Sequence, residues 1–191
     1  FKGQEDALRY ALCATAPESK DTDFTWTDFQ ARNNNELVAI FGNFINRVVV
    51  LTNKYWEGVV PACNALDAYD KEVLEKLKAF PDKIGASIEK YRFREALGEL
   101  MNLARLGNKY LADTEPWKLK KTDEKRTETI MNISIQISAS LAILSEPFMP
   151  FSSEKLKRLL NLSNVTWNNA GGIIINDNHK IKPANHLFNK I

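Results

Sequence analysis

Cysteine and histidine are scarce in this chain of 191 residues, which contains two of each. Cys13 and Cys63 lie far apart, and no Cys-x-x-Cys or His-x-x-His pair occurs. These spacings exclude the common zinc sites, so we expect no metal to be bound by this chain. We expect the two cysteines to be free, buried side chains rather than a disulfide.

Long apolar runs are absent as well. No stretch approaches the roughly 18–20 uninterrupted apolar residues of a membrane-spanning helix, so we expect no membrane partner. The chain begins Phe-Lys-Gly-Gln, with neither an initiator methionine nor a signal peptide. These features predict a piece of a longer, cytoplasmic polypeptide.

Glycine and proline are also few, at eight and seven residues, and they form no repeat or linker. Collagen-like, disordered and low-complexity chains are therefore excluded. Lys and Arg number 26 against 24 Asp and Glu, which leaves a net charge of +2. A charge this small neither requires nor excludes a nucleic acid as partner.

What the sequence does contain is helical periodicity. Apolar residues recur every three or four positions and predict six helices, at residues 5–16, 28–55, 68–91, 93–112, 124–145 and 152–160. Pro81 is expected to kink or split the third of them. The tail, residues 166–191, is predicted to form a short β-hairpin around the turn 176–178 and then an extended arm. The fold class is therefore all-α, a helical bundle.

The helix predicted at 28–55 has a polar face with an unusual pair of side chains. At 100° per residue, its apolar positions fall within roughly 140° of arc, and Asn43 and Arg47 lie outside this arc. Lys54 continues the same polar line. An amide and a guanidinium one turn apart can present donors and an acceptor to one base edge, although exposed helix faces commonly carry such residues.

Catalytic motifs are missing from the sequence. Neither histidine follows a glutamate by three positions, as a di-iron bundle would need. No Gly-x-Ser-x-Gly elbow and no phosphate-binding glycine-rich loop occur. We therefore expect no catalytic residue in this chain.

Trp117 follows Pro116 at the end of the helix predicted at 93–112. A tryptophan in this place can fill the core, but its surroundings are basic: Lys118, Lys120, Lys121, Lys125 and Arg126. An aromatic ring beside cations at a junction of helices is what stacking on an unpaired RNA base requires. Binding to a single-stranded RNA loop is thus one hypothesis for this junction.

Five stretches together resemble a known family: residues 36–47 (ELVAIFGNFINR), 112–118 (ADTEPWK), 6–10 (DALRY), 21–26 (DTDFTW) and 147–150 (PFMP). In their order along the chain, these stretches are similar to the anticodon-binding domain of methionyl-tRNA synthetases and to the segment just before it. The resemblance extends from about residue 4 to residue 160. Glu-Pro-Trp alone would be unspecific, whereas the combination is specific.

The resemblance implies roles for three residues. Asn43 and Arg47 match the family's Asn and Arg that contact the first base of the CAU anticodon. Trp117 matches the family's tryptophan that stacks on that cytosine. The implied partners are the anticodon loop of methionine tRNA and the catalytic domain of the same polypeptide, with no DNA.

The resemblance also implies which parts of the enzyme lie outside this chain. The family's ATP- and methionine-binding fold and its zinc knuckle precede the first residue, so ATP and zinc are cofactors of the missing part and none is expected here. Residues 1–34 would end the stem-contact segment, 35–165 would form the anticodon-binding bundle, and 166–191 the hairpin and the arm toward the catalytic domain. The parent enzyme would join methionine to its tRNA, and this piece alone should be inactive.

Two alternatives remain open at this stage. The same bundle occurs in other class I synthetases, such as the isoleucine, valine, leucine and cysteine enzymes, although the combination of Asn43, Arg47 and Trp117 argues against them. A helical protein–protein interaction module would suit the near-neutral charge, and a large exposed apolar face would favour it.

Overall fold

The computed structural model describes residues 3–18 and 21–191; residues 1–2 and 19–20, within the predicted stem-contact segment, lie outside this description. The described elements are α1 (Glu5–Ala14), α2 (Trp26–Arg32), η1 (Asn33–Gly42), α3 (Asn43–Trp56), α4 (Ala68–Glu89), α5 (Phe93–Thr114), α6 (Pro116–Leu119), α7 (Glu124–Leu144), α8 (Pro150–Leu159) and η2 (Trp167–Asn169). The predicted all-α class is confirmed.

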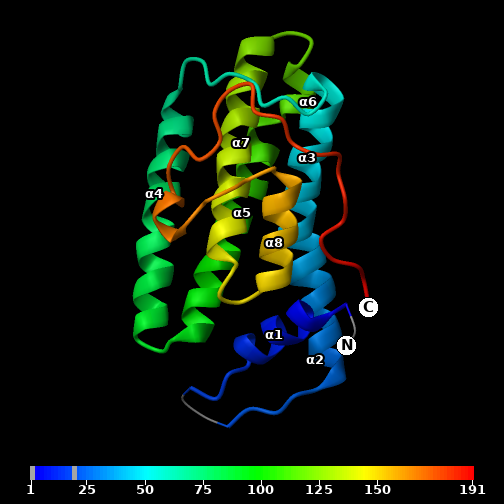
Figure 1. Cartoon of the computed structure of the whole chain (residues 1–191), viewed down its shortest axis with the longest axis vertical. Coiled ribbons are helices and arrows are strands. Elements are labelled where there is room, and N and C mark those ends of the chain that lie inside the picture. Colours follow the sequence, from blue (N-terminus) through cyan, green and yellow to red (C-terminus); the bar gives the residue numbers. More distant parts are fainter. Residues whose placement is uncertain (1–2, 19–20) are drawn as a thin grey trace.

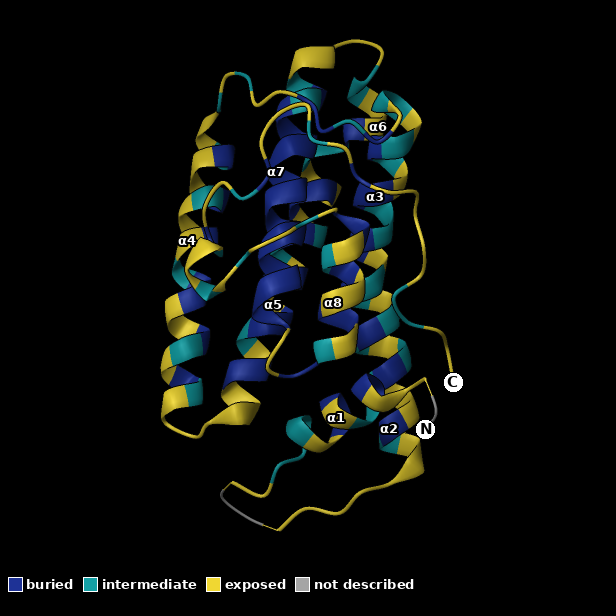
Figure 2. Ribbon diagram, in the orientation of Figure 1, coloured by how far each residue is buried: buried dark blue, intermediate teal, exposed yellow. Residues whose placement is uncertain are grey.

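The bundle is built around α7. Helices α3, α4, α5, α7 and α8 follow the long axis of the molecule, and α1 crosses one end of them (Figure 1). Every residue from Ile130 to Leu144 is buried, as the dark ribbon of α7 in Figure 2 shows. Polar residues of α7 tolerate burial because they have hydrogen-bond partners, some one turn earlier in the helix and some in distant segments such as the tail. Ser134 and Ser138, for example, donate hydrogen bonds of 2.8 and 2.9 Å to carbonyls one turn earlier.

The helix predicted at 28–55 is continuous from Trp26 to Trp56, but its middle part, η1, is a π-helix. Its last wide turn is closed by the N–H of Asn43, which bonds to the carbonyl of Val38 five residues earlier. The ordinary α-helix α3 begins at Asn43, so Asn43 and Arg47 keep the spacing of one α-helical turn. The helix passes without a break through the predicted border at residue 34, and that division into domains stays a prediction.

Helix α4 contains Pro81 but does not split there, so this part of the expectation is wrong. Proline removes the N–H that would have bonded to the carbonyl of Leu77. Gly171 of the tail packs at this place: a Cβ added to it would lie 3.1 Å from Pro81 Cγ and 3.2 Å from the Leu77 carbonyl oxygen. Close packing of the tail thus covers the part of α4 that proline weakens.

The predicted C-terminal hairpin is also wrong, because side chains of α7 take the backbone groups that a partner strand would need. Oε1 of Gln136 accepts hydrogen bonds from the N–H groups of Ile174 (2.8 Å) and Ile175 (3.1 Å). Further along, Lys180 forms an isolated antiparallel bridge with Val59 instead. No strand occurs in the described ranges.

The last residues form the expected extended arm, and its end is held by α2 and η1. The side chain of Asn33 donates to the carbonyl of Asn189 at 2.9 Å. Gln30 and Asn34 donate to the carbonyl of Ile191 at 2.7 and 2.9 Å. Three amide side chains on one helix therefore anchor the C-terminal end of the chain.

Both cysteines are free, as expected. Cys13 is half-buried, and burial raises the pKa of its thiol to about 11. Cys63 is exposed, so the expectation that it is buried is wrong. It lies in the loop after α3, where the chain runs along the surface before α4 begins.

Candidate nucleic-acid interface

The polar face predicted for the long helix is present in α3. Phe44, Ile45 and Val48 are buried, whereas Asn43 and Lys54 are exposed and Arg47 is half-buried. The polar line is therefore confirmed, and it leaves the Asn43 amide and the Arg47 guanidinium on the open side of the bundle.

A sharp turn between α5 and α6 positions Trp117. Glu115 has a left-handed backbone (φ 41°), which ends α5 and reverses the chain, and Pro116 then starts α6 with its fixed φ. The carboxylate of Glu115 forms an ion pair with Lys118 at 2.8 Å, across the same turn. This local geometry directs Trp117, the second residue of α6, away from the core.

The tertiary structure brings Arg47 and Trp117 together from different helices. The guanidinium carbon of Arg47 lies 4.8 Å from the centroid of the Trp117 ring. The Trp117 residue keeps 36% of its surface exposed, so it is not core filler. Such a cation–π contact at an exposed site is worth about 0.5–1 kcal/mol, weak enough to be exchanged for a stacked base.

Asn108 is a member of this site that sequence reasoning missed. Its side chain lies on α5 and donates to the carbonyl of Ile40 at 2.9 Å. Its amide oxygen accepts a long hydrogen bond of 3.5 Å from Nδ2 of Asn43. Asn108 thus holds the Asn43 side chain next to α5 with a weak contact, and no motif in the sequence signals this pairing.

A second group of aromatic and basic side chains lies at the end of α3. The ammonium of Lys120 lies 4.3 Å from the ring centroid of Trp56 and 5.7 Å from that of Tyr55. Lys54 lies 5.6 Å from the same Tyr55 ring. Tyr55 and Trp56 were not singled out by the sequence, because aromatic residues at a helix end are common in cores.

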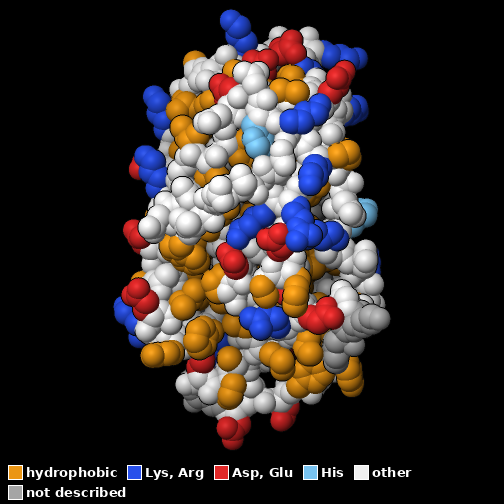
Figure 3. Space-filling model, in the orientation of Figure 1, with side chains coloured by type: hydrophobic (Ala, Val, Ile, Leu, Met, Phe, Trp, Pro, Cys, Tyr) orange, Lys and Arg blue, Asp and Glu red, His pale blue; other side chains and the backbone are white. Residues whose placement is uncertain are grey.

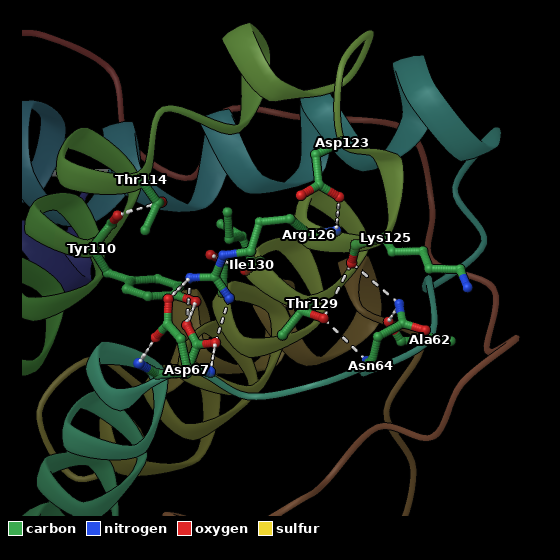
Figure 4. A network of polar contacts seen from close by, with 12 residues as sticks. Ala62, Asn64, Asp67, Tyr110, Thr114, Asp123, Lys125, Arg126, Thr129 and Ile130 are labelled. Atoms are coloured by element: carbon green, nitrogen blue, oxygen red, sulfur yellow. Dashed lines mark hydrogen bonds and ion pairs between the residues drawn. The ribbon is translucent and has the colours of Figure 1, made fainter.

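Arg126, one of the basic residues grouped with Trp117, points inward and is unavailable to a ligand. Its guanidinium pairs with Asp70, which is fully buried, and with Asp67 at 2.8 Å (Figure 4). The hydroxyl of Tyr110 donates to Asp70 at 2.6 Å. The expected role of Arg126 in a basic surface is therefore wrong: a buried carboxylate needs a charged partner, and Arg126 supplies it.

This network changes the acid–base properties of its members. Burial alone would raise the pKa of Asp70, but hydrogen bonds from Arg126, from Tyr110 and from the backbone of Asp67 outweigh it and lower the pKa. Burial, followed by the hydrogen bond to Asp70, raises the pKa of the Tyr110 phenol. Asp70 therefore stays ionised at neutral pH and joins α4, α5 and α7.

Over residues 3–18 and 21–191, no cluster of three or more His, Cys, Asp or Glu side chains is arranged to hold a metal ion. In the same ranges, no helix combines the length and the apolar composition needed to span a bilayer.

Comparison with known proteins places this chain in a family. The family model described as the anticodon binding domain of methionyl tRNA ligase matches residues 60–191. A second model, tRNA synthetases class I (M), matches residues 2–49. Together the two models cover both α3 up to Val49 and the turn that carries Trp117.

Individual proteins agree with the family models. The methionine–tRNA ligase of Cytophaga hutchinsonii is 62% identical over 100% of this chain and 28% of its own length. That of Bacteroides fragilis strain YCH46 is 55% identical over 100% of this chain and 27% of its own. This chain thus spans less than a third of either relative.

The crystal structure of apo Mycobacterium tuberculosis methionyl-tRNA synthetase has the same fold, with a TM-score of 0.92 at 22% identity. The match covers 97% of this chain and 39% of that protein. The fold, the motifs and the family model agree, and the chain belongs to the methionyl-tRNA ligase family as its anticodon-binding domain.

Proposed function

We propose that this domain binds the anticodon loop of methionine tRNA and selects the CAU anticodon through Asn43, Arg47 and Trp117. The observation that carries the proposal is the contact between the Arg47 guanidinium and the exposed Trp117 ring, 4.8 Å apart on two helices. A base that stacks on the ring lies within reach of a guanidinium and, one turn away, of the Asn43 amide. Stacking supplies affinity for any base, and hydrogen bonds to the base edge supply discrimination.

The function of the whole enzyme follows from the relatives and is part of the same proposal. The parent protein joins methionine to tRNA with ATP, and this domain supplies the recognition of the anticodon. The domain has no catalytic activity of its own, and ATP and zinc belong to the part that lies outside this chain. The match to the methionine family favours this function over the other class I synthetases and over a protein–protein interaction module.

The first test compares two short RNA stem-loops that differ only at the first anticodon base. One carries CAU, and the chain is titrated with each at low salt, because phosphate contacts weaken as salt rises. We expect tighter binding of the CAU loop. Equal binding of both loops by the unchanged chain would contradict the proposed selectivity.

Replacing Trp117 by alanine is expected to weaken binding of the CAU loop at least tenfold, because base stacking on an aromatic residue is worth about 1–3 kcal/mol. Trp117→Phe, which keeps a smaller ring, should lose less affinity than Trp117→Ala. Circular dichroism should show unchanged helicity, since the ring is exposed. If Trp117→Ala instead lowers the melting temperature strongly and leaves binding of the folded protein intact, the ring is structural.

Replacing Arg47 by glutamine is expected to reduce the preference for cytosine at the first position. Glutamine keeps a hydrogen-bonding group but loses the charge and the planar fork of donors. The ratio of the two dissociation constants is the quantity to measure, so that a general loss of affinity is not mistaken for lost selection. Lys83→Gln, a change of the same charge on α4, should leave the ratio unaltered. A ratio that stays at the parent value in Arg47→Gln removes Arg47 from base selection.

A further inference from the structure

The helix that carries Asn43 and Arg47 is wide just before these residues. Asn33–Gly42 (η1) form a π-helix, whose N–H groups bond to carbonyls five residues earlier. The N–H of Asn43 closes the last wide turn on the carbonyl of Val38. Such turns are rare, usually single, and frequent at functional sites. A π-helix of ten residues therefore needs contacts from outside the helix to persist.

The arm, residues 182–191, supplies such contacts at the start of η1. It runs beside α3 and ends near α2 (Figure 1). Its backbone bonds to two amide side chains of η1: Asn33 donates to the carbonyl of Asn189 at 2.9 Å, and Asn34 accepts from the N–H of Ile191 at 3.0 Å. Because Asn33 is only 3% exposed, the arm supplies a partner that water could not easily replace.

At the other end of η1, the arm packs a ring against the last wide turn. Phe188 is half-buried, and its ring centroid lies 5.8 Å from that of the buried Phe41, edge to face at 88°. Gly42 leaves room for this ring: an added Cβ would lie 3.5 Å from Phe188 Cδ2 and 3.0 Å from the Leu37 carbonyl oxygen. The arm thus contacts both ends of η1, and Gly42 directly precedes Asn43.

The path of the arm toward η1 is fixed by α8. Lys and Arg side chains gather over α8 on the face shown in Figure 3, mixed with acidic ones. Lys157 pairs with Glu146 at 2.7 Å. Lys155 instead donates to the carbonyl of His186, two residues before Phe188. One cation of this surface therefore holds the arm where its ring can reach η1.

The same wide turn is connected to the candidate site through α5. Asn108 donates to the carbonyl of Ile40, in the last turn of η1, at 2.9 Å and accepts from Asn43 at 3.5 Å. If this turn relaxed to an α-helix, the N–H of Asn43 would bond to the carbonyl of Ala39 instead of Val38. Each residue of shifted register turns a helix by 100°. Asn43, the first residue of α3, is therefore directly affected by the geometry of η1.

We propose that Phe188 is a positioning residue for the selection of the first anticodon base. By holding η1 wide, its ring sets the place of Asn43 and, one turn further, of Arg47. Phe44 and Ile45 are buried and keep α3 in the bundle, so loss of the ring should shift the site without unfolding it. The inference rests on the proposed function and extends it to a segment that does not contact the base.

The test replaces Phe188 by alanine and titrates the folded chain with the CAU stem-loop and its one-base variant. We expect the ratio of the two dissociation constants to fall by about threefold or more, the order of effect of one lost aromatic pair. Phe188→Leu keeps an apolar side chain against Phe41 and should lose less. In the free protein, NMR should show the Asn43 N–H exchanging faster relative to the amides of α7, because its bond to Val38 opens more often.

The matched control is Ile175→Ala, which removes another tail side chain, one that is buried beside α7. It should lower the melting temperature but leave the ratio and the relative exchange of Asn43 unchanged. A parent-like ratio or parent-like exchange in Phe188→Ala would overturn the inference, as would an equal fall of the ratio in Ile175→Ala. If the unchanged chain shows no CAU preference, the proposed selectivity fails and the positioning role with it, while the exchange of Asn43 still shows whether the arm holds η1.

Discussion

Replacing Asp70 by alanine is expected to lower the free energy of unfolding by about 3–5 kcal/mol. The Asp70 carboxylate is fully buried and accepts hydrogen bonds from Arg126, from Tyr110 and from the backbone N–H of Asp67. Without it, Arg126 keeps a charge at a partly buried place, and the capping box that starts α4 is lost as well. Removing one partner of a buried pair typically has a cost of this size.

Urea denaturation followed by circular dichroism measures the effect. Asp70→Asn should be intermediate, because it keeps the shape and one acceptor oxygen but not the charge. Glu75→Ala is the matched control on the same helix, since Glu75 is exposed and its ion pair with Lys78 contributes little. An unfolding free energy of Asp70→Ala within about 1 kcal/mol of the parent would show that the network is not a main support of the bundle.

Replacing Gly107 by alanine is expected to destabilise the domain by about 3 kcal/mol, at the upper end of the usual cost of overpacking. Gly107 lies on α5 against the buried ring of Phe44 on α3. An added Cβ would lie 2.4, 2.6 and 2.7 Å from three atoms of that ring. The Phe44 ring is rigid and 0% exposed. Either the ring must shift within the core, or α3 and α5 must move apart.

Gly98→Ala is the control for this prediction, since it makes the same change in the same helix. A Cβ at Gly98 meets nothing within 4 Å, so only helix propensity changes, and alanine should stabilise the helix by about 0.5–1 kcal/mol. The two variants should therefore shift the melting temperature in opposite directions. If Gly107→Ala is as stable as the parent, the close packing of α3 on α5 is not required.

The displacement of Phe44 also has a consequence for recognition. Phe44 follows Asn43 directly, so a helix pushed away from α5 would move Asn43 from Asn108 and Arg47 from Trp117. Even where Gly107→Ala stays folded at low temperature, we expect weaker binding of the CAU stem-loop. Gly107 thus links the packing of the core to the geometry of the candidate site.

The helices could be predicted closely, because an apolar period is a local property of the sequence. The predicted segments at 93–112 and 124–145 differ from α5 and α7 by one or two residues. The tail was predicted wrongly for a non-local reason. Isoleucines 173–175 have the composition of a strand, but Gln136, almost forty positions away, takes their backbone groups.

The same distinction between local and non-local causes applies to the candidate site. The open positions of Asn43 and Arg47 follow from the apolar period of their own helix, and the turn at Pro116 follows from its local residues. The partners of these residues do not follow from local sequence. Asn108 meets Asn43 only because α5 packs beside α3, and Lys120 lies over Trp56 only because the chain after α6 returns to the end of α3.

By itself, the sequence determined that the chain is an all-α bundle, which side of the long helix is polar, and which family the motifs resemble. Only the tertiary structure decided which cations face solvent. Arg126 belongs to the same basic run as Lys118, yet it is turned inward because Asp70 of α4 is buried beside it. Arg47, by contrast, lies over the ring of Trp117 because α3 and α6 both pack against α7. The sequence determines which residues are charged, but the packing of the helices determines the partner of each charge. The physical reason is that a buried ion without a partner is costly, and only a residue brought close by packing can serve as its counter-ion.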